Sequence, residues 1–147
     1  MAEVIRVVMT EHGCSGAGFA IHDDEVLAMS ASYRGDCARY YVVEQDGVVQ
    51  GGGGFAPLEG APADSGVCEL RKMYFRPEAR GLGLGRSMLA LLLDEMQLAG
   101  FRRCYLETTT QMHAAKRLYL AAGFVEQPEM EGATGHHGCD RFFSKAL

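Results

Sequence analysis

The sequence predicts an α/β (α+β) fold, in which helices pack on a mixed sheet, and three observations lead to that expectation. A hairpin pattern contains the turn Asp46-Gly47, helical spacing extends from Leu84 to Ala99, and strands alternate with helices after Val67. Such an order implies a sheet in which part of the run is parallel. At 147 residues the chain has the length of one domain, so we expect a single domain over residues 1–147.

Composition and charge exclude several classes of protein. Hydrophobic residues make up 48% of the chain and charged residues 22%, as in ordinary globular proteins. No apolar run approaches the roughly 20 residues that span a bilayer, and the N-terminus lacks the order of a secretory signal. We therefore expect a cytoplasmic protein with no membrane partner. The net charge of −5 argues against nucleic acid as a partner, because that affinity depends on Lys and Arg.

The cysteines predict neither disulfides nor zinc. They are odd in number, widely spaced and free of CxxC pairs, so we interpret them as reduced thiols: Cys14, Cys37, Cys68, Cys104 and Cys139. His136 and His137 precede Cys139, but no fourth ligand lies nearby at zinc-finger spacing. We expect no metal here, and a loop that shapes a binding pocket.

The N-terminal third has the least regular pattern. Ala2 to His12 is β-branched enough for a strand, yet its apolar positions also fit one helical face, and we favour a helix. Glycines follow. Asp23 or Asp24 is then placed to cap a short second helix that reaches about Tyr33.

The clearest hairpin spans Arg39 to Gln45, the turn Asp46-Gly47, and Val48 onward, because Asp-Gly supplies the positive φ angles of a type I′ turn. The run Gly51 to Gly54 lies in its second arm. A strand so poor in side chains indicates a bulge or a close approach by another backbone or a ligand. The alternative is that these glycines form a flexible loop.

The second half of the sequence is more regular. Glycines close both predicted helices, at positions 100 and 123. The predicted elements are a strand over Val67–Phe75, a helix over Leu84–Ala99, a strand over Arg103–Thr108, a helix over Met112–Ala122 and a strand from Phe124 onward.

A glycine-rich loop, Arg80-Gly-Leu-Gly-Leu-Gly-Arg86, joins the predicted strand Val67–Phe75 to the predicted helix Leu84–Ala99. Its backbone N–H groups would point outward at a helix N-terminus, which is an anion site, and its two arginines can add charge-assisted hydrogen bonds. No Gly-Lys-Ser/Thr follows, so the loop is not a Walker loop. A Rossmann fingerprint would need glycine at Arg86 or Met88. The loop therefore predicts a pyrophosphate site of another kind.

Two motifs carry a family resemblance. The Arg80 to Gly85 segment reads R-x-x-G-x-G, and Ala115 to Phe124 reads A-x-x-L-Y-x-x-x-G-F. In this order and spacing they resemble the GNAT family of N-acetyltransferases, whose central motif lies between its fourth strand and third helix. The resemblance implies a central sheet of about six strands with helices on both faces, and strands four and five splayed to admit coenzyme A.

The resemblance also implies a function. The chain would move an acetyl group from acetyl-CoA, as co-substrate, to a primary amine of a small molecule or peptide, by direct transfer in a ternary complex. A noncatalytic acyl-CoA-binding sensor or regulatory protein is the alternative. The residues implied to bind the cofactor are Met73, Tyr74, Phe75, Arg80, Gly81, Leu82, Gly83, Leu84, Gly85, Arg86, Ser87 and Thr108.

Two residues are candidates for catalysis. Glu69 lies eleven residues before Arg80, the offset of the glutamate base in the histone-acetylating members. Burial in a sheet would raise its pKa, whereas pairing with Arg71 would lower it, and both interpretations stay open. Tyr119 matches the tyrosine that can protonate the coenzyme A sulfur, with core packing as the alternative. Cys68 suggests a covalent route, but adjacent strand residues face opposite sides, which favours direct transfer.

Two departures from the family pattern stand out. Met112 replaces an asparagine that contacts the cofactor in many members, and a first helix at Ala2 to His12 would leave out the family's first strand. An uncovered sheet edge predicts a homodimer. The acceptor amine is not identified by the sequence, although several polar residues are candidates for its pocket: His22, Asp23, Asp24, Tyr33, Tyr40, His136 and His137.

Overall fold

The computed structural model describes residues 1–147 and contains a six-stranded sheet in the order β1-β2-β3-β4-β6-β5. Strands β3 and β4 are parallel, and every other neighbouring pair is antiparallel, so the predicted mixed sheet is confirmed. The strands are β1 (Arg39–Gln45), β2 (Val48–Pro57), β3 (Val67–Phe75), β4 (Arg103–Thr108), β5 (Val125–Gln127) and β6 (Arg141–Ala146).

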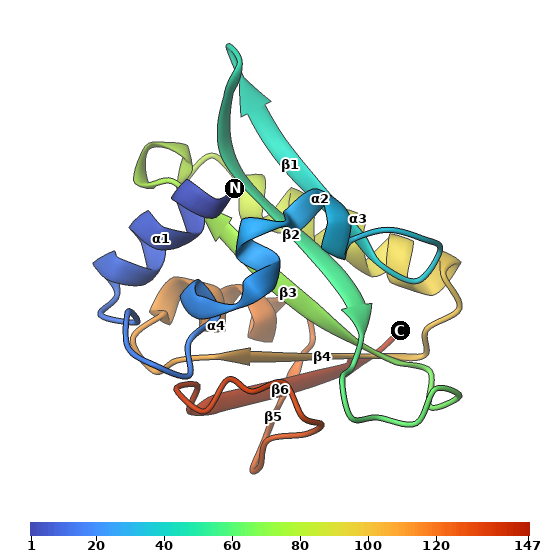
Figure 1. Ribbon diagram of the computed structural model, residues 1–147. Helices are drawn as coiled ribbons and strands as arrows, with labels where there is room; N and C mark the ends of the chain where they lie inside the picture. The colour runs from blue at the N-terminus through green and yellow to red at the C-terminus, as the bar shows by residue number, and fades with distance from the viewer.

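Helical segments cover both faces of the sheet (Figure 1). One face carries the N-terminal segments α1 (Ala2–Glu11), η1 (Ala20–His22), η2 (Asp24–Leu27) and α2 (Met29–Ser32). The other face carries α3 (Leu84–Leu98) and α4 (His113–Ala121), and a short turn of helix, η3 (Pro77–Ala79), follows β3. No helix has the length and apolar character needed to cross a membrane.

The N-terminal helix is confirmed, but the predicted second helix from Asp23 to about Tyr33 is wrong. It is divided into η2 and α2 at Ala28, whose φ of −135° lies outside the helical region. Asp23 precedes η2 without capping it, because its side chain is held by groups on other segments. Strand β6 at the C-terminus is an element that the sequence pattern did not predict.

The hairpin and its glycine run lie in the predicted strands. Asp46 and Gly47 have φ angles of +52° and +76°, as a type I′ turn requires. A Cβ atom added to Gly52 would lie 2.4 Å from the carbonyl oxygen of Tyr41, and one on Gly53 would lie 2.8 Å from Cγ of Met73. Close approach is therefore the reason for these glycines, and the flexible-loop alternative is wrong.

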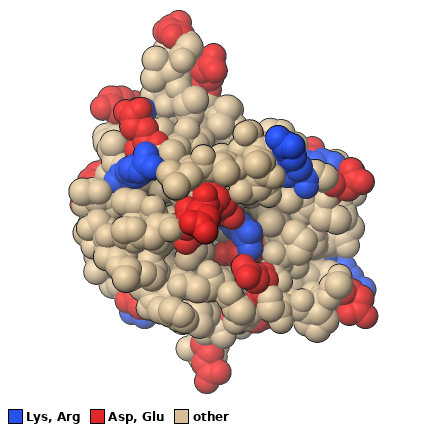
Figure 2. Space-filling model, viewed as in Figure 1, with Lys and Arg blue, Asp and Glu red and all other residues tan.

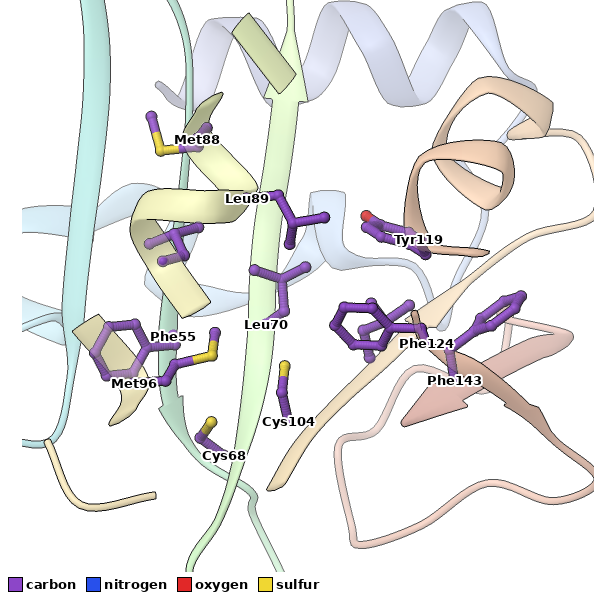
Figure 3. Packing of buried hydrophobic residues seen from close by; sticks show 12 residues of the cluster. Phe55, Cys68, Leu70, Met88, Leu89, Met96, Cys104, Tyr119, Phe124 and Phe143 are labelled. Carbon is purple, nitrogen blue, oxygen red and sulfur yellow. The ribbon is translucent and has the colours of Figure 1, made fainter. Parts of the chain in front are cut away.

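The main core lies between the sheet and the helices α3 and α4 (Figure 3). Leu92 and Met96 of α3 are fully buried against Phe55 of β2 and Cys104 of β4. Each fully buried apolar side chain of this size contributes roughly 1.5–3 kcal/mol of stability. A smaller cluster on the opposite face, formed by Ile5, Met9, Cys14, Ala20 and Val26, attaches the N-terminal segments.

Candidate active site

The parallel strands β3 and β4 separate along their length. They pair only from Val67 opposite Arg103 to Glu69 opposite Tyr105, and no pairing continues beyond Glu69. The splay that the resemblance implies for strands four and five therefore lies between β3 and β4. A cavity of about 60 Å³ occupies this place and is bordered by Glu69, Tyr119 and His136.

A bulge in β3 decides which side chains face the cavity. Between the pairs Gly52–Tyr74 and Gly54–Arg71 the strand β3 contains one residue more than β2, and Lys72 within it has a φ of +50°. The extra residue interrupts the alternation of faces. Arg71 and Lys72 consequently point to the same side, where both side chains contact Glu25. The Tyr40 hydroxyl donates to the Lys72 carbonyl at 2.7 Å.

Glu69 is the buried carboxylate of this cavity. Its side chain is 3% exposed and accepts a hydrogen bond from Nε of Arg71 at 2.7 Å. Burial raises the pKa of Glu69 more than the neighbouring Arg71 guanidinium lowers it. The ion pair that the sequence suggested is present, yet it does not outweigh burial. Cys68 points the other way into the main core, as the alternation of faces predicted.

Tyr119 reaches the same cavity from α4. Its ring packs on Phe124 and Phe143, and its hydroxyl points towards β3 (Figure 3). Burial raises the pKa of Tyr119, and no hydrogen bond to another side chain contributes to the shift. Its ring belongs to the core while its hydroxyl borders the cavity, so packing and a chemical role are compatible.

His136 holds three segments together. Its Nε2 lies 2.9 Å from Oδ2 of Asp23, and its Nδ1 lies 3.3 Å from Oε2 of Glu107 and 3.8 Å from Oε1 of Glu69. Although burial opposes the change, the hydrogen bonds to Asp23 and Glu107 raise the pKa of His136 to about 9. The imidazole is therefore cationic at neutral pH.

Lys72 is the most deeply buried cation beside the cavity. Its side chain is 2% exposed, and its Nζ lies 2.6 Å from Oδ2 of Asp23 and 2.6 Å from Oε1 of Glu25. Glu25 also accepts from the Tyr33 hydroxyl at 2.8 Å. These contacts fix η2 over the bulge of β3.

The glycine-rich loop leads into α3. None of the backbone N–H groups from Gly81 to Arg86 donates a hydrogen bond within the protein, and the helix begins at Leu84. Gly81 and Gly83 have φ angles of +77° and +81°, and a Cβ on either would meet no protein atom. A row of unused donors at a helix N-terminus, with open space before it, fits a pyrophosphate.

The side chains of the loop lie away from the cavity. Arg80 donates to both carboxylate oxygens of Glu11 on α1, at 2.8 and 2.7 Å, while Leu82 and Arg86 are exposed. The Ser87 N–H donates to the Gly83 carbonyl at 3.1 Å. The groups of the loop that are available to a ligand are therefore its backbone N–H groups, because the Arg80 side chain is already paired with Glu11.

The other predicted cofactor residues lie along the separation of the strands. Met73 and Tyr74 of β3 border the cavity, as does Thr108 at the end of β4. Phe75 lies against the glycine run of β2 instead. Met112, at the family's asparagine position, lines the cavity and packs on the N-terminal cluster.

The candidate acceptor residues divide into two groups. Asp23 and His136 belong to the charged network around the cavity, which consists of Asp23, Glu25, Glu69, Arg71, Lys72, Glu107 and His136. The hydroxyls of Tyr33 and Tyr40 donate hydrogen bonds to Glu25 and to the Lys72 carbonyl. His22 is exposed and contacts the carbonyl of Ser15, and Asp24 and His137 are exposed. No group of three or more His, Cys, Asp or Glu side chains is arranged to hold a metal ion.

Sequence reasoning did not identify Lys72, Glu25 or Glu107 as site residues. Glu107 lies on β4, where its carboxylate accepts from the hydroxyls of Tyr105 and Thr134, each at 2.9 Å. A signal for Lys72 was available, because strict alternation would place this charged residue beside Cys68 and Leu70 in the core. That conflict indicates a bulge.

A second hollow of about 570 Å³ lies at the opposite end of β3 and β4. Its arginines are engaged: Arg103 pairs with Glu131, and Arg102 donates to the carbonyls of Asp64 and Ser65. The one carboxylate that lines this hollow is Glu131, which Arg103 holds, so no unpaired acid or base faces it.

Comparison with known proteins agrees with this geometry. Residues 7–124 match the profile of the Acetyltransferase (GNAT) family. The chain belongs to the GNAT acetyltransferase family. Its match to the GNAT profile contains both the glycine-rich loop and the Tyr119 motif, so the resemblance that those motifs carried is confirmed.

Individual relatives extend the comparison. The chain is 40% identical over 141 residues to the uncharacterized N-acetyltransferase YjgM of Escherichia coli, an alignment that covers 95% of this chain and 83% of YjgM. It is 31% identical over 102 residues to IAA acetyltransferase of Azospirillum brasilense, covering 69% of this chain and 61% of that protein.

Solved structures share the fold. A GNAT acetyltransferase from Staphylococcus aureus Mu50 superposes with a TM-score of 0.79 at 17% identity, covering 99% of this chain and 90% of that one. The yncA protein of Salmonella typhimurium, solved with its cofactor acetyl-CoA, superposes with a TM-score of 0.75 at 24% identity, covering 99% and 87%. The sheet with its separated parallel strands is therefore the GNAT fold.

Proposed function

We propose that this chain is an N-acetyltransferase that moves the acetyl group of acetyl-CoA to a primary amine by direct transfer in a ternary complex. One observation carries the proposal: Glu69 and Tyr119 border a single cavity where β3 and β4 separate. The free N–H groups of Gly81 to Arg86 supply a site for the pyrophosphate. The bound acetyl-CoA in yncA, which has the same fold, supports that choice of acetyl donor.

Glu69 acts as the base. An amine enters mainly as an ammonium ion, which cannot attack a carbonyl until it loses a proton. Because burial raises the pKa of Glu69, its carboxylate accepts a proton more readily than an exposed glutamate does. Arg71, in contact at 2.7 Å, holds the carboxylate in place.

Tyr119 acts as the acid. Acetyl-CoA supplies a thioester whose carbon–sulfur bond breaks as the carbon–nitrogen bond forms. The raised pKa of Tyr119 keeps its hydroxyl protonated at neutral pH, so it can donate that proton to the departing sulfur. Tyr119 regains a proton from the new amide nitrogen through solvent. The net products are an amide, a thiol and one proton.

The experiment is a coenzyme A release assay over primary amines, combined with thermal melting in the presence of nucleotides. We expect acetyl-CoA to raise the melting temperature, because a ligand that binds only the folded state stabilises it, and ATP and NAD to have no such effect. Release that depends on an added amine supports transfer. Stabilisation without release for any amine would favour the noncatalytic acyl-CoA sensor.

We further infer a single domain and a homodimer. All strands join one sheet, which supports a single folding unit. No strand of residues 1–147 covers the outer edge of β1, and Val42 on this strand is 50% exposed. Unpaired edges favour association. Light scattering should give twice the chain mass, and Val42→Lys should shift the protein to monomer; a monomeric wild type would contradict the homodimer.

A further inference from the structure

The charged network around the cavity leaves no cation free. Lys72 contacts the carboxylates of Asp23 and Glu25, each at 2.6 Å. Arg71 contacts Glu69 at 2.7 Å and Glu25 at 3.5 Å. Each of these basic groups is thus held by two carboxylates.

His136 completes the network in the same way, between Asp23, Glu107 and Glu69. No buried side-chain nitrogen or oxygen atom in the protein lacks a hydrogen-bond partner. A ligand that entered the cavity with its own carboxylate would find every cationic group already engaged by an internal one.

The net charge of the network also disfavours a ligand that carries a carboxylate. Four carboxylates (Asp23, Glu25, Glu69 and Glu107) face three cations (Arg71, Lys72 and His136), which leaves one negative charge when Glu69 is ionised. One ammonium group neutralises this charge. A zwitterion with its carboxylate beside the ammonium would bring a fifth carboxylate into the network.

The remaining walls of the cavity are largely apolar. They come from α1, η1, β3 and α4, and include Met9, Phe19, Ala20, Met73, Met112 and Tyr119. Outside the cavity, acidic side chains gather near the middle of the face that carries the N-terminal segments (Figure 2). Both features suit a cation with an apolar body.

We infer that the acceptor is an amine whose nitrogen-bearing carbon carries no carboxylate, and that free α-amino acids are excluded. This inference rests on the proposed function and names the substrate class of the same cavity. An α-carboxylate would lie within a few bonds of the attacking nitrogen, close to Glu69 and Glu107. Like charges placed together at a desolvated site disfavour a ligand strongly.

The test compares amines that differ only at that carbon. Tyramine, phenethylamine, histamine and isoamylamine are each assayed beside tyrosine, phenylalanine, histidine and leucine, and beside the methyl esters of those amino acids. We expect kcat/KM for the best amine to exceed that of its amino acid at least about tenfold, because of the added like charge. We expect the methyl ester to recover most of the rate.

Two neighbouring variants sharpen the test. Asp23→Asn removes a carboxylate that engages both Lys72 and His136, so a substrate carboxylate gains a partner and the discrimination against the amino acid should fall. Asp24→Asn is the matched control, because Asp24 is exposed and forms no ion pair; it should keep the discrimination.

Two outcomes would overturn the inference. Amino acids that react as well as their amines would overturn it while leaving the N-acetyltransferase function intact, since coenzyme A would still be released. No release with any amine, amino acid or ester, despite thermal stabilisation by acetyl-CoA, would overturn both the inference and the proposed function.

Discussion

The glycine-rich loop and the charged network around the cavity are built in opposite ways. The loop is one run of seven residues, Arg80 to Arg86, and its chemistry belongs to backbone N–H groups. The network joins side chains from η2, β3, β4 and the loop before β6, and its members lie up to 113 positions apart. The loop, as the proposed cofactor site, therefore depends on local conformation, whereas the charged network, as the proposed acceptor site, depends on tertiary contacts. The two sites should therefore fail separately when mutated.

Glu69→Gln should have the largest effect. It keeps the shape of the side chain beside Arg71 but removes the proton acceptor, so kcat should fall at least about 100-fold, the scale of general base catalysis. The affinity for acetyl-CoA, measured by calorimetry, should stay the same. Glu44→Gln, at an exposed position of the hairpin, is the control. An unchanged kcat would show that Glu69 only pairs with Arg71.

Lys72→Met should act on stability. The change leaves the partly buried carboxylates of Asp23 and Glu25 without the Lys72 charge, and breaking such a buried pair costs about 3 kcal/mol. For a chain of this size the melting temperature should fall by roughly 6–12 °C in calorimetry. Lys116→Met, which breaks no ion pair, should change it little. Equal melting temperatures for the two variants would contradict the importance of the Lys72 contacts.

Gly83→Ala should affect the loop alone. An alanine is disfavoured at the φ of +81° by roughly 1–2 kcal/mol, so the loop should relax and the affinity for acetyl-CoA should fall about 5- to 30-fold. Gly16→Ala is the control, since Gly16 has no positive φ and no close neighbour. Titration calorimetry measures both variants. Wild-type affinity in Gly83→Ala would mean that this conformation is not needed for binding.

His136→Gln should give the smallest effect, one that depends on pH. The pKa of His136 is raised to about 9, so its contribution to stability is complete below its unfolded pKa of about 6.5 and is lost as the pH rises through 9. The carboxylates that face it are Asp23, Glu69 and Glu107. The variant should melt a few degrees below wild type at pH 6 and match it near pH 10. A gap that widens with pH would contradict a cationic His136.

The difference between local conformation and tertiary contacts also explains which features could be predicted from the sequence. The hairpin turn, the start of α3 at Leu84 and the conformation of the glycine-rich loop depend on residues close in the chain, and the structure confirms these elements. That the loop binds an anion stays a prediction. The contact between Glu69 and Arg71 was predictable too, because residues two apart in a strand share a face. Lys72 was missed because the bulge reverses that rule one residue later.

The short N-terminal elements were harder for a related reason. The sequence prediction used the Asp23 carboxylate as a local helix cap. In the structure this carboxylate instead contacts Lys72, 49 positions away, and His136, 113 positions away. Contacts at that separation leave no periodic trace in the sequence. Asp23 was nevertheless among the candidate acceptor residues, since its residue type suits a cationic amine.

The central claim is that acetyl transfer occurs between β3 and β4. Its most direct test measures how fast the Tyr119→Phe variant releases coenzyme A in a single turnover. Phenylalanine keeps the ring on Phe124 and Phe143 and removes only the proposed proton donor. We expect the rate to fall about 100-fold while acetyl-CoA binds as tightly as to wild type. A wild-type rate in Tyr119→Phe would contradict the account.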